Sequence, residues 1–211
     1  MARVVVGCLL VLFVSSTDAF AQIRRSHWGL SFDFVPTWKV PDYQEKILDA
    51  DSIELEGKSF RAGFVRGAPR RGEWGLAFVR RSFNDGATVV RDGARTTLDP
   101  GARITGGEIH GYSPFVTIKE RVQIGMEYAI GAGVIQGTGV FTPVAGASRP
   151  VDAKAFFKVF DRELSVAPMA RLELVAALIV GRGLKLRASG GLSVPGQHTF
   201  SAGATYFFGA R

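Results

Sequence analysis

Two pairs of side chains in this sequence have the residue types of catalytic or metal-binding groups. The first is His198 with Ser201, the combination in which an acyl hydrolase uses an imidazole to activate a hydroxyl. On a strand, such a pair shares a face only when it is two residues apart, and these two are three apart. They therefore point to opposite faces, and we expect the chain not to be an enzyme.

The second pair is Glu108 and His110, which do share a face and could orient a base or contribute to a metal site. Two ligands are too few for a metal ion, and His27 and His198 lie elsewhere without metal-ligand spacing. The only cysteine is Cys8, which excludes thiolate sites and disulfides. We expect no metal and no cofactor. Glu108 and His110 are better interpreted as polar side chains that fill the interior of the fold.

Charged residues of both signs recur on one face of several alternating stretches. In 122–130, Gln123 and Glu127 share a face with Gly125, whereas Ile124 and Tyr128 lie on the other. One face suits lipid and the other does not. If strands with such faces close into a narrow barrel, the opposite charges meet inside it and are expected to form a paired, hydrogen-bonded filling. The predicted interior charge network consists of Arg61, Glu73, Glu127, Arg171, Glu173, Lys185 and Arg187.

Eight alternating stretches must position these charges. They are 28–35, 59–65, 73–81, 107–118, 122–130, 163–177, 184–194 and 197–208, with a bulge expected near Pro114. Long polar segments at 37–58, 82–105 and 132–162 alternate with tight turns at 69–72, 119–121 and 181–183. This order predicts an all-β fold, an eight-stranded antiparallel up-and-down transmembrane β-barrel whose long loops face outside the cell.

The N-terminus has the layout of a secretory signal. Arg3 precedes an apolar run over 4–14, which is shorter than the ~20 residues of a spanning helix, and a small-x-small site ends at Ala21. We expect cleavage after Ala21, which divides the chain into a signal peptide at 1–21 and one barrel domain at 22–211.

Basic residues give the chain a net charge of +7 and cluster at Arg66, Arg70, Arg71, Arg80 and Arg81. Such a cluster is typical of nucleic-acid binding. A secreted barrel does not meet nucleic acid, so we interpret the cluster as strand ends and turns that face anionic lipid headgroups. We expect Trp28, Trp74, Tyr128 and Tyr206 to lie at the same headgroup level.

The mature chain as a whole resembles the small outer-membrane β-barrels of Gram-negative bacteria, in particular the eight-stranded OmpA-like and OmpW-like types. In that family the last strand carries an aromatic signal for the barrel-assembly machinery, and Phe200, Tyr206 and Phe208 resemble it. The resemblance implies an outer-membrane location, contact with outer-membrane lipid and lipopolysaccharide, and a monomer. It implies nothing about a catalytic activity.

Three functions follow from these patterns. The mixed charges inside and the three long segments outside favour a structural or surface-interaction role. Glycine-rich inner faces keep open a small channel or carrier for hydrophobic or small polar solutes. The third alternative is a secreted soluble barrel that binds a ligand in its interior.

Overall fold

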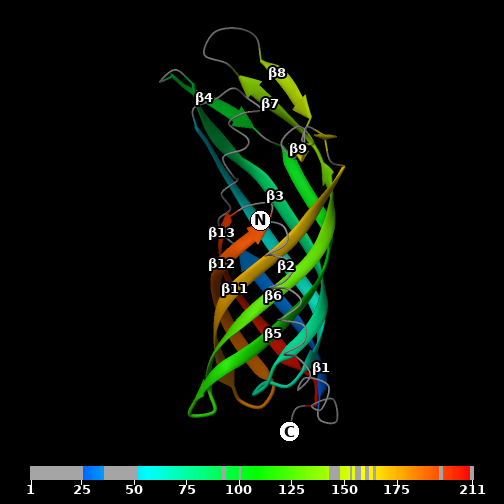
Figure 1. Ribbon diagram of the computed structural model, residues 1–211, viewed down its shortest axis with the longest axis vertical. Helices are drawn as coiled ribbons and strands as arrows, with labels where there is room; N and C mark the ends of the chain where they lie inside the picture. The colour runs from blue at the N-terminus through cyan, green and yellow to red at the C-terminus, as the bar shows by residue number, and fades with distance from the viewer. Residues whose placement is uncertain are drawn as a thin grey trace.

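The computed structural model describes residues 26–35, 52–91, 94–99, 101–142, 148–152, 154, 158–159, 162–163, 165–194 and 197–209. Eight strands form the wall: β1 (His27–Val35), β2 (Ser52–Gly67), β3 (Glu73–Arg91), β5 (Ala102–Ile118), β6 (Val122–Gln136), β11 (Val166–Val180), β12 (Leu184–Val194) and β13 (Gln197–Phe207). Each is antiparallel to the next, and β1 pairs with both β2 and β13, which closes the ring (Figure 1). The predicted eight-stranded up-and-down barrel is confirmed.

Side chains alternate across this wall with the period of two that the sequence predicts. On β6, Glu127 is 1% exposed, whereas Ile130 on the opposite face is 46% exposed. Large apolar side chains cover the outside, among them Phe64 at 65% and Leu174 at 56% exposure. A water-soluble barrel would bury such residues, so the wall is built to contact lipid.

Tight turns connect the wall strands at one end of the barrel. Lys119 and Glu120 adopt φ angles of 47° and 56°, and the Arg121 amide donates to the Ile118 carbonyl at 3.1 Å. Gly181 reaches a φ of 65°, a left-handed conformation that glycine adopts at no steric cost. Both turns lie where the sequence predicts them.

The opposite end differs from the prediction, because the sheet continues past the closed ring. β4 (Ala94–Asp99) pairs with the far part of β3, β7 (Thr138–Thr142) pairs with β4, and β8 (Arg149–Asp152) pairs with β7 (Figure 1). A separate two-stranded sheet joins β9 (Lys158–Val159) to β10 (Arg162–Glu163).

The expectation that 82–105 and 132–162 are long loops is therefore wrong in part, because strands occupy much of both segments. Strand pairing needs only backbone amides and carbonyls, whereas an apolar/polar alternation of the sequence requires two faces with different surroundings, which lipid and the interior provide in the wall. Beyond the lipid-facing wall, strands persist and the alternation disappears. In the segment 37–58, β2 already begins at Ser52, and 36–51 lie outside the described residues.

Two details of register also bear on the prediction. The expected bulge is confirmed, since the β5–β6 pairing shifts between Pro114 and Val116. The predicted sixth stretch, 163–177, is displaced by three residues, because Glu163 pairs with Lys158 in the small sheet and β11 starts at Val166.

The described part of the chain contains no helix long and apolar enough to cross a membrane. Residues 1–25 lie outside the described residues, so the signal peptide and the domain boundary after Ala21 stay predictions.

Candidate functional site in the barrel interior

Buried charges fill the middle of the barrel. Every member of the predicted set is at most 6% exposed: Arg61, Glu73, Glu127, Arg171, Glu173, Lys185 and Arg187. Asp33, Arg81 and Glu108 are buried with them, which gives five acidic and five basic side chains among the described interior residues. The formal charge of this interior is thus balanced when His110 is neutral.

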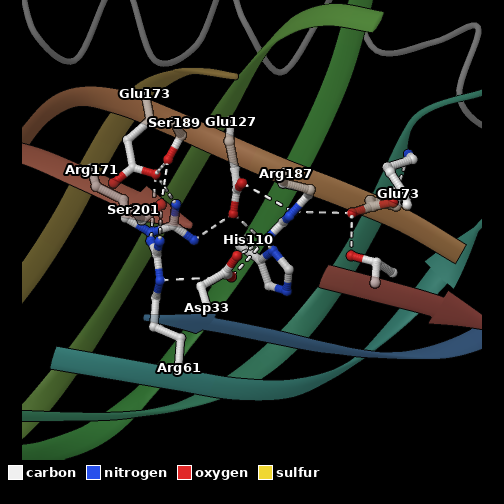
Figure 2. Close-up of polar contacts among 12 residues, drawn as sticks. Asp33, Arg61, Glu73, His110, Glu127, Arg171, Glu173, Arg187, Ser189 and Ser201 are labelled. Carbon is white, nitrogen blue, oxygen red and sulfur yellow. Dashed lines mark hydrogen bonds and ion pairs between the residues drawn. The ribbon is translucent and has the colours of Figure 1, made fainter. Parts of the chain in front are cut away.

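Arg171 on β11 is the centre of one half of this network (Figure 2). Its guanidinium donates to Glu127 at 2.6 Å, to Glu108 at 2.8 Å and to Glu173 at 2.9 Å. Three carboxylates from three elements therefore surround one cation, a geometry that fits the planar fork of arginine.

Arg187 on β12 organises the other half. It donates to Asp33 at 2.7 Å and to Glu73 at 3.1 Å, and it lies 3.1 Å from Glu127. Glu127 thus touches both central guanidinium groups and joins the two halves (Figure 2). His110 also faces it, with Nδ1 3.4 Å from Oε1 of Glu127.

Hydroxyl groups complete the coordination of Glu173. Ser189 and Thr199 each donate to it at 2.8 Å, and Arg61 lies 3.5 Å away. Arg61 also donates to Ser201 at 3.0 Å. Because these partners come from β2, β12 and β13, the network ties the first strands of the barrel to the last.

Glycines on the inner face give these long side chains their room. A Cβ placed at Gly203 would overlap the carboxylate of Asp33, and one at Gly75 would lie 2.9 Å from Nε2 of His110. The glycine-rich inner face is therefore occupied by side chains from neighbouring strands and is not a lumen at these positions.

Bulky residues lie at both ends of the charged layer. At the turn end, Lys185 bonds Glu73 at 2.9 Å and lies 4.7 Å above the ring of Tyr112 and 5.6 Å from that of Phe207. At the loop end, one cross-strand row of inner residues is at most 3% exposed: Val35, Ser59, Arg81, Ile104 and Ile135. This row lies on five of the eight wall strands and includes Arg81, so the buried charges themselves reach the loop end.

The described side chains of the two candidate pairs, Ser201, Glu108 and His110, lie in the polar network of the interior. Ser201 lies beside the hydroxyl of Ser189 and accepts from Arg61, and the side chain of His198 lies outside the described residues. Glu108 and His110 belong to the charge network. Within the described ranges, no three His, Cys, Asp or Glu side chains are grouped as metal ligands.

The basic cluster separates into two environments, which corrects its interpretation. Arg81 is 3% exposed and lies inside the barrel, so it does not face headgroups. Arg70 is in a turn, 65% exposed, and pairs with Glu120 at 2.9 Å. The parity of β3 places Arg81 on the same face as Glu73, a signal that the adjacent Arg80 obscures.

The three aromatic residues of the predicted assembly signal lie on the outside of the last strand and just after it. Phe200, Tyr206 and Phe208 are 63%, 52% and 47% exposed. Tyr206 and Phe208 meet edge to face with ring centroids 5.6 Å apart. They are accessible to lipid or to another protein.

Comparison with known proteins gives distant similarity only. No protein-family model matches the chain, and no curated protein gives a significant match. The attachment invasion locus protein Ail of Yersinia pestis, solved with the heparin analogue sucrose octasulfate, is similar at 15% identity and a TM-score of 0.35, over 87% of this chain and 97% of that one. The β domain of the Bordetella autotransporter BrkA is similar at 13% identity and a TM-score of 0.35, over 87% and 99%.

These similarities are too low to bear on function, and the fold rests on the strand pairing and burial of the chain itself. Eight consecutive antiparallel strands close on themselves, large apolar side chains face outward, and charged side chains face inward. The chain therefore has the fold of the small outer-membrane β-barrels.

Proposed function

We propose that this protein is a closed barrel of the bacterial outer membrane that serves as a structural anchor for an interaction surface outside the cell. The observation that carries this proposal is the filled interior. Five acidic and five basic side chains are buried there, and their contacts with one another and with Thr199 and Ser201 involve all eight wall strands. Such a filling holds a barrel shut, because moving one charge leaves its partner buried and unpaired.

The sheet beyond the ring supports the second half of the proposal. β4, β7 and β8 extend the sheet outward from β3, away from the tight turns (Figure 1). A strand rises ~3.3 Å per residue, so these paired strands project well beyond the ring. This extension is the part of the described chain best placed to meet a partner outside the cell.

The remaining parts of the proposal concern location and assembly. The exposed apolar wall supports contact with outer-membrane lipid, and lipopolysaccharide would surround its loop end. The outward aromatic residues Phe200, Tyr206 and Phe208 are proposed as the signal for the barrel-assembly machinery. We propose a monomer with no nucleic-acid partner and no catalytic activity.

Conductance in planar bilayers tests the closed barrel directly. The refolded wild-type protein should show no steady current, because buried charged side chains fill the interior. Arg187→Ala, which removes a central side chain that contacts three carboxylates, should produce a measurable leak. A steady ohmic current in the wild type would favour the channel or carrier.

A soluble ligand-binding barrel is the other alternative, and partition distinguishes it. The exposed wall predicts that the protein enters the detergent phase and migrates differently on gels before and after heating. Recovery in the aqueous phase without detergent would favour the soluble barrel.

A further inference from the structure

An arginine on the outside of the barrel lies between two exposed tryptophans at the turn end. Arg66 is paired in register with Trp28 on one side and Trp74 on the other, and these rings are 56% and 54% exposed. The Arg66 guanidinium carbon lies 5.5 Å from the centre of the Trp28 ring, and Nε donates to Ser26 at 2.9 Å. Among the described residues, the contacts of Arg66 are with Trp28 and Ser26, and no carboxylate pairs with it there.

A groove opens on the same outer face, further along β2 from this arginine. It has a volume of about 810 Å³ and extends over β13, β1, β2, β3 and β5. Small side chains create it, since Ala62 is paired between the rings of Phe32 and Phe78, and Ala204 lies opposite Phe32. Its lining is almost entirely apolar, which suits a hydrocarbon chain and excludes a polar ligand.

Arginine and groove are continuous along β2. Phe64 lines the groove and stands two residues from Arg66 on the same face, and Ala62 stands two residues further. At ~3.3 Å per residue, the arginine lies about 7 Å and 13 Å from these two positions along the strand. A molecule with an anionic head and an apolar tail can therefore occupy both at once.

We propose that this face of the barrel binds one anionic phospholipid, with its phosphate at Arg66 and one acyl chain in the groove. An arginine fork donates two hydrogen bonds to a phosphate, and tryptophan rings favour the headgroup level. The site lies near the tight turns, so the lipid belongs to the leaflet on that side. This inference rests on the proposed membrane location and adds a lipid of defined chemistry.

Fluorescence quenching by brominated lipids tests the site. The chain has three tryptophans, and Trp38→Phe leaves only the two that flank Arg66. In phosphatidylcholine vesicles, acyl-brominated phosphatidylglycerol should reach a given degree of quenching at roughly one fifth of the mole fraction that brominated phosphatidylcholine needs. This is the preference expected for one basic residue near the surface.

Two substitutions with matched controls distinguish a specific lipid-binding site from general electrostatic attraction of anionic lipid to the barrel. Arg66→Gln should abolish the preference, and Arg70→Gln, which removes an equal charge from the turn end, should keep it. Ala62→Phe should reduce quenching by filling the groove, and Ala176→Phe, on the outer face of β11, should not.

Three results would overturn the proposal. Equal loss of preference in Arg66→Gln and Arg70→Gln would show diffuse attraction. Quenching that falls as protein density rises would assign the groove to a second copy of the chain. Absence of quenching by either lipid would mean that the barrel has not entered the bilayer, which would overturn the proposed location as well.

Discussion

Replacing Glu127 with glutamine should destabilise the barrel more than any surface charge change. Its carboxylate lies 2.6 Å from Arg171, 3.1 Å from Arg187 and 3.4 Å from His110, at 1% exposure. Glutamine keeps the shape and one acceptor oxygen but removes the charge. The interior then holds one cation in excess.

The size of the destabilisation in Glu127→Gln follows from the contacts that the two guanidinium groups keep. Breaking a buried pair costs ~3–5 kcal/mol, because a charge is left buried without its partner. Here each of the two guanidinium groups keeps two other carboxylates. We therefore expect a loss at the lower end of the range, about 3 kcal/mol in the free energy of unfolding.

Urea titration of folding into phospholipid vesicles, followed by heat-modifiable gel migration, measures this loss. Glu120→Gln is the matched control, since its side chain is 72% exposed and its removal should cost less than about 0.5 kcal/mol. Combining Glu127→Gln with Arg171→Gln restores charge balance, so the double variant should lose less than the sum of the two. Equal stability of Glu127→Gln and Glu120→Gln would refute the network.

Three further measurements check other parts of the structure. Leu174→Arg, in the middle of the lipid-facing wall, should cost about 2–4 kcal/mol in a bilayer, whereas Val180→Arg at the end of the same strand should cost about 0–1 kcal/mol; equal costs would contradict the depth assignment. N-terminal sequencing of protein purified from membranes should begin at Gln22, and a sequence that still contains Cys8 would contradict the signal cleavage. On intact cells an impermeant maleimide should label Val140→Cys but not Arg182→Cys, and the reverse result would invert the proposed orientation.

The sequence predicts the wall of this barrel well because a bilayer imposes a strict rule on it. Each wall strand must present one face to lipid, so the inner position of Glu127 follows from Ile124 and Tyr128 alone. Outside the lipid-facing wall that rule ends, and the sequence gives no pattern from which β4, β7 or β8 could be recognised. The buried position of Arg81 follows from the parity of β3, but the adjacent Arg80 obscures that signal.

Side-chain contacts across the interior of the barrel are a second feature that the sequence alone does not predict. The alternation places Asp33 and Arg187 inside, but their contact depends on how far each strand is shifted relative to its neighbour around the ring. Register along the sheet is set by many pairings together, and no short segment of sequence encodes it. The contacts of Arg171 with Glu108 and Glu127 became visible only with the closed ring.

The distance along the chain between interacting charges has a consequence for how the barrel is made. Asp33 on the first strand bonds Arg187, 154 residues later, and Arg61 bonds Ser201, 140 residues later. A partly inserted sheet would bring these charges into hydrocarbon before their partners arrive. Threading strands into the bilayer one at a time is therefore unfavourable, and insertion must be coupled to joining the first strand to the last. An open, surface-bound sheet that closes and enters the membrane in one cooperative step is the assembly route that this interior requires.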